Sequence, residues 1–257
     1  QRQMCIRDRK ESQLLYQIYN GKYEFNPQYL SVYRVPLLDF GVMAPVALSM
    51  PLAMDFGTSN TTAGVYLDRQ YFEKTGLREG ELGLKSNSIN YVPFYNKSVD
   101  WEETTLFPSV VGVQSVESGK PHFLFGYNAI KLVESSYIDE GFCVFYDIKR
   151  WVGDYEKQEE ITDRQGRRGF VSRKEILREY FEYIIMAARN RFKCDVKSVH
   201  ISCPVKQKTQ FQRLFSDILS EYTVEKNDMI DEGVSVLYNT ISGMIQKGNV
   251  QEGDCLL

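Results

Sequence analysis

The chain of 257 residues is poor in the side chains that build metal centres and covalent cross-links. It has two histidines, and its five cysteines stand at positions 5, 143, 194, 203 and 255, with no pair in a CxxC spacing. Scattered cysteines are typical of reduced thiols in a cytosolic protein rather than of a disulfide framework. The sequence therefore argues against a zinc site, a histidine-based metal site and a disulfide-stapled fold.

Long apolar runs and an excess of charge of one sign are also lacking. The most membrane-like stretch, residues 35–54, contains an aspartate and three prolines, and it lies too far from the N-terminus for a signal peptide. The net charge of −3 gives no general electrostatic attraction to nucleic acid. We therefore expect a soluble, cytoplasmic protein with no nucleic-acid partner and no membrane partner.

What the chain has is the composition of an ordinary globular protein, with 43% hydrophobic and 25% charged residues. Residues 1–50 form an N-terminal extension to which we assign no role. Within it, residues 1–9, QRQMCIRDR, resemble translated sequencing-adapter DNA and are interpreted as an artefact. Regular patterns begin at residue 51, so the second predicted part of the chain covers residues 51–257.

This second part predicts an α/β fold. The strands expected in its first half are joined by tight turns and cover residues 52–56, 61–67, 106–113 and 122–126. Its second half alternates helices with strands, and a capping box at Ser172 and Glu175 opens the first of these helices. The charged stretch 154–168 is expected to be exposed. Hairpins imply antiparallel strands and strand–helix alternation implies parallel ones, so we expect a mixed β-sheet with flanking helices.

One stretch, AMDFGTSNTTAGVYL at residues 53–67, joins an acidic residue to a glycine-containing turn. Asp55 stands at the end of a buried strand, where a carboxylate is desolvated unless it binds a cation or hydrogen-bond donors. The turn after it offers successive backbone N–H groups, which form an anion-binding concavity. Mg²⁺ together with a phosphate would satisfy both halves. On this stretch alone, a plain hairpin turn with an aspartate at its edge explains the pattern equally well.

The segment MDFGTSNTTAGVYL resembles the first phosphate-binding hairpin of the superfamily of actin, sugar kinases and heat-shock chaperone ATPases. Within that superfamily it is most similar to the DnaK-type heat-shock protein 70 family. Further stretches match that family in the same order along the chain: TLFPSVVGV, FGYNAIKLV, DIKRWVG, VHISCPV and MIDEGVSVLYNTISG. The resemblance covers residues 51–257, and several motifs in order are far less expected by chance than one.

The resemblance implies an RNase H-like/actin-like ATPase lobe that binds ATP with Mg²⁺ and couples ATP hydrolysis to client polypeptides and co-chaperones. The roles that it implies are Mg²⁺ binding for Asp55, phosphate binding for Gly57, Thr58, Ser59 and Asn60, and catalysis for Lys149 and Glu232. Such groups suit phosphoryl transfer, in which a protein mainly positions the reactants and neutralises charge. Taken singly, Lys149 is better explained as part of a solvated helix face, and Glu232 as an ordinary first-turn acid that favours the helix dipole; it is the set of motifs in order that favours the catalytic roles.

Departures from the family pattern limit the resemblance. Gly233 stands where the family has proline, and Arg213 is offset from the family's coupling arginine. The family's second phosphate motif would begin just after Leu257. We therefore expect the first lobe of an ATPase domain that is incomplete at its C-terminus and that alone neither binds ATP tightly nor hydrolyses it. The alternatives are a sugar or acid kinase of the same superfamily and a non-hydrolysing actin-like scaffold.

Overall fold

A computed structural model describes residues 45–96, 102–117, 119–136 and 141–224, together with Val234, Leu237, Thr240, Ile241, Met244 and Ile245. The chain from Ala44 onward forms one compact unit. The six isolated residues all have helical backbone, within the helix that the sequence predicts from Asp231. No helix among the described residues is both long enough and apolar enough to cross a membrane.

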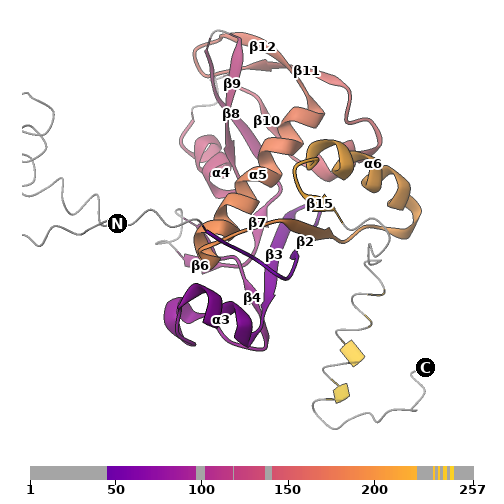
Figure 1. Ribbon diagram of the computed structural model, residues 1–257. Helices are drawn as coiled ribbons and strands as arrows, with labels where there is room; N and C mark the ends of the chain where they lie inside the picture. The colour runs from indigo at the N-terminus through magenta and orange to yellow at the C-terminus, as the bar shows by residue number, and fades with distance from the viewer. Residues whose placement is uncertain are drawn as a thin grey trace, which may run out of the picture. The chain divides into compact units, whose positions relative to one another are not determined.

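The central element is a mixed β-sheet with the strand order β15-β14-β2-β3-β4, to which β7 adds by pairing with β3 (Figure 1). The strands are β2 (Leu52–Phe56), β3 (Asn60–Leu67), β4 (Ser88–Tyr91), β7 (Phe107–Pro108), β14 (Ser198–Ile201) and β15 (Thr223–Val224). The β2, β3 and β4 strands are antiparallel to their neighbours along the meander, whereas β14 runs parallel to both β2 and β15. The predicted mixed sheet of an α/β fold is therefore confirmed.

Alternation of side chains along β2 explains why one face of this sheet is covered. Leu52, Met54 and Phe56 are buried, whereas Ala53 and Asp55 between them are exposed on the opposite face. The helices that cover the buried face are α5 (Arg173–Phe192) and α6 (Lys208–Ile218). The Phe56 ring meets that of Phe181 on α5 with a centroid separation of 5.0 Å, so the strand before the turn is fixed directly to the helix layer.

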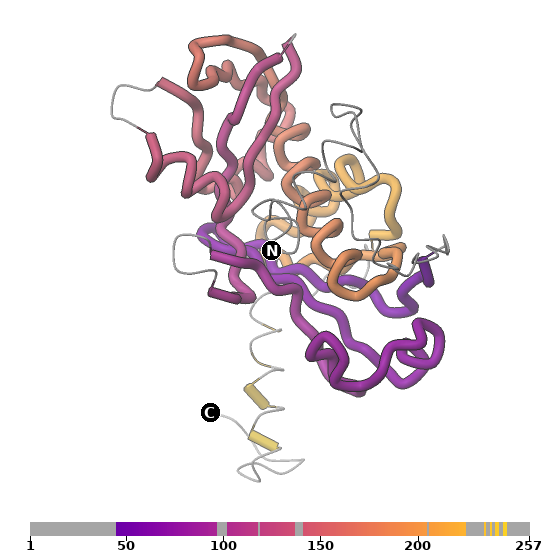
Figure 2. Tube along the Cα trace, turned by 90° about the vertical axis from the view of Figure 1, so that its left-hand side faces the viewer, coloured from indigo at the N-terminus to yellow at the C-terminus, as the bar shows by residue number. Residues whose placement is uncertain are grey.

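A second antiparallel sheet has the order β10-β8-β9, formed by β8 (Val111–Glu117), β9 (Lys120–Phe125) and β10 (Val144–Phe145). Figures 1 and 2 show α5 between the β8–β9 hairpin and α6 from two directions. The stretch 154–168 was expected only to be exposed, but it contributes to a hairpin of β11 (Gln158–Thr162) and β12 (Arg168–Ser172). Asp163 at its tip accepts a hydrogen bond from the N–H of Arg167 across the turn and another from the N–H of Val116 on β8.

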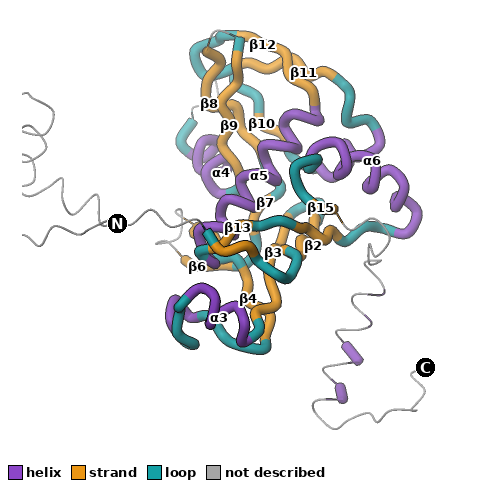
Figure 3. Tube along the Cα trace, viewed as in Figure 1, coloured by secondary structure: helices purple, strands orange, loops and turns teal. Residues whose placement is uncertain are grey.

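The remaining elements connect these sheets, and Figure 3 separates them into helices, strands and loops. The Ser172 hydroxyl accepts from the N–H of Glu175, so the predicted cap of α5 is confirmed. The other elements are α3 (Arg69–Thr75), α4 (Tyr127–Glu134), β1 (Val46–Ala47), β5 (Phe94–Asn96), β6 (Glu102–Thr104), β13 (Cys194–Asp195) and 3₁₀ helices at Glu81–Gly83, Ile148–Gly153 and Val205–Gln207. The β1 strand pairs with β13 in parallel, so residues 46–47 of the predicted N-terminal extension belong to the same unit as the sheets.

Candidate functional site

The turn between β2 and β3, residues 57–60, is closed by one backbone hydrogen bond. The N–H of Gly57 donates to the carbonyl of Asn60 over 3.0 Å. A Cβ atom at residue 57 would lie 2.3 Å from that carbonyl oxygen, so the close approach of the two strands requires glycine. The glycine of the quoted motif therefore has a local physical reason, which is independent of any bound ligand.

The turn is held from behind by Ser109, which follows β7. Its N–H donates to the carbonyl of Ser59 over 2.9 Å, and its hydroxyl donates to the carbonyl of Gly57 over 2.8 Å. In a trans peptide the C=O and the N–H point in opposite directions. Since these two carbonyls face Ser109, the N–H groups of Thr58 and Asn60 face the other way. The support at the back thus orients donors toward the front of the turn.

A chain of hydroxyl groups connects this support to α5. The Tyr180 hydroxyl donates to the Thr61 hydroxyl over 2.9 Å, and the Thr61 and Ser109 hydroxyls are 3.2 Å apart. A hydroxyl has one proton to donate, and that of Ser109 is given to Gly57. Thr61 must therefore be the donor to Ser109. The Tyr180 hydroxyl also lies 3.4 Å from the carbonyl of Pro108, and with its proton on the shorter bond to Thr61 the chain runs in one direction from Tyr180 to the turn. Burial raises the pKa of Tyr180 to about 12, so this donor keeps its proton at all physiological pH values.

Asp55 lies at the carboxyl end of β2, beside the end of the parallel strand β14. Its carboxylate accepts a hydrogen bond from the Ser202 hydroxyl over 2.6 Å, and the N–H of Ser202 donates to the carbonyl of Met54 over 3.0 Å. The sequence led us to expect a desolvated carboxylate at a buried strand end. The structure corrects this, because Asp55 is on the uncovered face of the sheet and its side chain is exposed.

The front of the turn can accept an anion. Thr58, Ser59 and Asn60 are exposed, and within the described part of the chain the N–H groups of Thr58 and Ser59 have no hydrogen-bond partner. Exposed N–H groups of successive residues in a turn favour the binding of phosphate or carboxylate oxygens. Residues 57–60 and Asp55 thus place hydrogen-bond donors and one carboxylate at the same end of the sheet.

The donor set fits Mg²⁺ only in combination with a phosphate. Among the described residues no group of three His, Cys, Asp or Glu side chains could hold a metal by itself. Mg²⁺ keeps several waters and is commonly bound through one or two carboxylates plus substrate phosphates. Asp55 supplies one exposed carboxylate, held by Ser202, beside a turn in which the N–H groups of Thr58 and Ser59 have no partner among the described residues. The residues present therefore fit the metal–phosphate pair better than a bare metal.

The two predicted catalytic residues are not both placed by the structure. Lys149 lies on the 3₁₀ helix Ile148–Gly153 and is half-buried, with its ammonium 5.9 Å from the centroid of the Phe211 ring on α6. It is therefore more than a solvated surface cation, since it packs on an aromatic ring. Glu232 lies outside the described residues. The structure thus brings together Asp55 and residues 57–60, and it attaches Lys149 to α6.

Sequence reasoning missed three of the residues that build this site. Ser109 and Ser202 lie in the stretches TLFPSVVGV and VHISCPV, which resemble the family pattern, but neither has a role in the sequence-based prediction, and Tyr180 lies outside the stretches that carry this resemblance. A signal existed for Ser202, because the carboxyl ends of adjacent parallel strands lie at one edge of a sheet. Tyr180 gave no such signal, since its position in the helix is that of an ordinary core residue.

Comparisons with known proteins identified no relative of this chain. No family model matches the chain, and no curated protein matches it. The α/β class with its mixed sheet and flanking helices is a property of the structure itself. The site is likewise defined by the chain's own hydrogen bonds and side-chain positions.

Proposed function

We propose that this chain binds Mg²⁺-ATP at the turn 57–60, as the first lobe of an actin-like ATPase of the heat-shock protein 70 type. The observation that carries the proposal is the turn itself. Ser109 binds the carbonyls of Gly57 and Ser59 at the back, so the N–H of Thr58 faces the front, and the N–H of Ser59 has no partner among the described residues. A plain hairpin turn needs neither this second support nor an exposed carboxylate beside it. Asp55 supplies that carboxylate.

The residues of the chain divide the work of holding a triphosphate. The N–H groups and hydroxyls of Thr58 and Ser59 would donate to phosphate oxygens. Asp55 would bind the Mg²⁺ ion that accompanies the triphosphate. When bound, Mg²⁺ neutralises charge on the phosphates. Ser202 keeps the carboxylate of Asp55 oriented through their 2.6 Å hydrogen bond. The site thus positions the phosphates before any chemistry takes place.

Hydrolysis is assigned to Lys149 and Glu232. A lysine ammonium near the γ-phosphate compensates developing negative charge, and a glutamate orients or accepts a proton from the attacking water. In this proposal ATP turnover serves a chaperone cycle, with client polypeptides and co-chaperones as partners. Support from the fold comes from the sheet, because an RNase H-like lobe combines an antiparallel meander with added parallel strands, as β4-β3-β2-β14-β15 does.

The test of binding is a titration of the full chain with Mg²⁺-ATP, followed through the backbone amide signals by ¹H–¹⁵N NMR. We expect saturable shifts of the Thr58 and Ser59 amides with a dissociation constant on the order of 1 mM, which corresponds to about 4 kcal/mol. Asp55→Asn should remove the dependence on Mg²⁺, whereas Glu73→Gln, an exposed acid on α3, serves as the matched control. Unmoved Thr58 and Ser59 amides at saturating Mg²⁺-ATP would overturn the proposal.

Hydrolysis is tested separately by phosphate release from longer proteins that contain this chain, with Lys149→Ala and Glu232→Ala. Loss of turnover in both variants, with unchanged Mg²⁺-ATP binding, is the expected result. Turnover that is unchanged in both would contradict the two catalytic assignments. A rate that rises when a sugar or an acid is added would instead identify a small-molecule kinase.

A further inference from the structure

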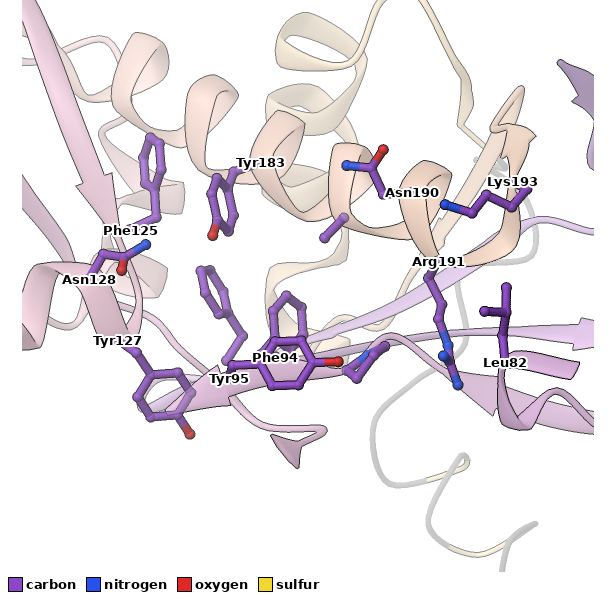
Figure 4. Close-up of a pocket in the computed structure, with 13 residues that line it drawn as sticks. Leu82, Phe94, Tyr95, Phe125, Tyr127, Asn128, Tyr183, Asn190, Arg191 and Lys193 are labelled. Atoms are coloured by element: carbon purple, nitrogen blue, oxygen red, sulfur yellow. The ribbon is translucent and has the colours of Figure 1, made fainter. Parts of the chain in front are cut away.

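A pocket of about 390 Å³ lies beside α5, near the strands β5 and β9 (Figure 4). Its volume falls in the range of about 300–1,000 Å³ that is typical of small-molecule sites. None of its lining residues belongs to the turn 57–60 or is Asp55, so it is distinct from the proposed phosphate site. The residues that give it chemical character are Phe94, Phe107, Phe125, Tyr183, Arg191 and Lys193.

One end of the pocket is built from stacked aromatic rings. The Phe107 ring stacks on that of Phe94 at a centroid separation of 4.4 Å and on that of Tyr183 at 5.3 Å, with an interplanar angle of 13° for the second pair. The Phe125 ring lies 5.4 Å from that of Tyr183, and Figure 4 shows these two together at one end. Phe107 is only 2% exposed because these rings cover it, so the aromatic surface open to a ligand is mainly that of Tyr183, which is 38% exposed. Such a surface favours a flat, apolar ligand.

The other end of the pocket is basic. Figure 4 shows Arg191 extending from α5 beside Leu82, away from Phe125. No carboxylate is among the residues that line the pocket, and within the described ranges neither Arg191 nor Lys193 has an ion-pair partner. The Nε of Arg191 is buried and has no hydrogen-bond partner there. Two cations without an ion-pair partner in the described ranges make this end of the pocket favourable for an anion.

The backbone at Lys193 provides a second, independent observation. Lys193 caps the C-terminus of α5 with φ 53° and ψ 32°, the left-handed conformation in which glycine is the usual residue. A side chain with a Cβ is strained there. Such local strain is found where a side chain serves a function that the favoured residue lacks. A lysine at the basic end of a pocket has such a function.

We propose that this pocket binds a planar aromatic carboxylate, with the ring system against Tyr183 and the carboxylate at Arg191 and Lys193. The pocket would bind the two parts of such a ligand at different places, since the aromatic residues are at one end and the cations at the other (Figure 4). The proposal does not depend on ATP binding at the turn.

The proposal is tested by isothermal titration of the full chain with three probes of matched shape. 2-Naphthoate has both features, 2-naphthamide lacks the charge, and decahydro-2-naphthoate lacks the aromatic faces. We expect 2-naphthoate to bind and each of the other two probes to bind about tenfold more weakly, because each loses one of the two interactions. Absence of 2-naphthoate binding, or equal affinity for the acid and its amide, would overturn the proposal.

Variants locate the ligand within the pocket. Arg191→Gln should weaken 2-naphthoate binding about tenfold, whereas Lys120→Gln, an exposed lysine at the far end of β9, should leave it unchanged. Lys193→Gly separates ligand binding from stability, since it should raise the melting temperature by about 2–4 °C while it lowers the affinity. Wild-type affinity in Arg191→Gln, or in Lys193→Gly once its melting temperature has risen, would contradict the placement of the carboxylate.

Discussion

The Ser109 hydroxyl donates to the carbonyl of Gly57 over 2.8 Å, although 52 positions separate the two residues along the chain. This bond ends the hydroxyl chain that begins at Tyr180 on α5 and passes through Thr61. The turn 57–60 is therefore coupled to the helix layer by hydrogen bonds as well as by the packing of Phe56 on Phe181. A turn held in this way keeps its open N–H groups in one orientation before a ligand arrives.

The first prediction concerns this hydroxyl chain. Ser109→Ala and Tyr180→Phe should each lower the free energy of unfolding by about 1–2 kcal/mol, because each leaves a buried polar partner unsatisfied. The double variant should cost less than the sum of the two, with a coupling energy of about 0.5–1 kcal/mol. Urea unfolding measures all three values. Ser115→Ala is the control, since among the described residues its hydroxyl has one hydrogen-bond partner, the exposed carboxylate of Glu117. Strict additivity would show that the hydroxyls do not act as a chain.

The second prediction concerns the close approach at Gly57. Gly57→Ala places a Cβ against the backbone oxygen of Asn60, which is unable to move without opening the turn. We expect a loss of about 1–3 kcal/mol in unfolding free energy, together with changed amide signals at Thr58 and Ser59. Gly141→Ala is the matched control, because a Cβ there meets no heavy atom within 4 Å. Equal unfolding midpoints for the two variants in urea would contradict this prediction.

The fold class followed from the sequence because its signals are local. The alternation of buried and exposed residues in β2 and the Ser172 cap of α5 depend on neighbours along the chain. Only part of the candidate site could be predicted from the sequence. Asp55 and the turn stand in one continuous stretch, but Ser202 reaches Asp55 across 147 positions through the pairing of β14 with β2, and a local pattern does not contain such a pairing.

The hairpin of β11 and β12 was missed for a related reason. The charge of the stretch 154–168 predicts only that it is exposed, but the stretch forms part of a hairpin whose turn is organised by Asp163. That buried carboxylate accepts hydrogen bonds from the N–H groups of Val116, Gln165 and Arg167 and from the Arg167 guanidinium. In the sequence, an aspartate whose carboxylate organises a turn looks the same as an aspartate that is exposed to water.

The third prediction is a pH dependence that comes from Asp163. Burial alone would raise the pKa of this carboxyl, but the hydrogen bonds from Val116, Arg167 and Gln165 outweigh it and lower the pKa to about 2. The unfolded chain has a carboxyl pKa of about 3.9, so the stabilisation is fully present above that value and is lost as the pH falls toward 2. Urea midpoints measured between pH 2 and pH 6 follow this loss.

Two variants separate the contributions to that acid dependence. Asp163→Asn should lower the stability at neutral pH and make the midpoint fall less steeply with acid, because the titrating group has gone. Arg167→Gln removes only the guanidinium and leaves the backbone donors. The urea midpoint of this variant should therefore still fall with acid, but less steeply than that of the wild type. If the urea midpoints of Asp163→Asn and the wild type fall in parallel as the pH is lowered, another carboxyl is responsible for the loss of stability in acid.

The last prediction concerns the orientation of Asp55. Ser202→Ala removes the 2.6 Å hydrogen bond to an exposed carboxylate, so the unfolding free energy should change by no more than about 0.5 kcal/mol. Binding of Mg²⁺-ATP should nevertheless weaken about three- to tenfold, because the free carboxylate loses its preferred orientation. Ser202→Thr keeps the hydroxyl and should restore the affinity. A loss of stability that Thr also restores, with Mg²⁺-ATP affinity unchanged throughout, would make Ser202 a structural residue of the β14 terminus rather than a positioning residue for the metal.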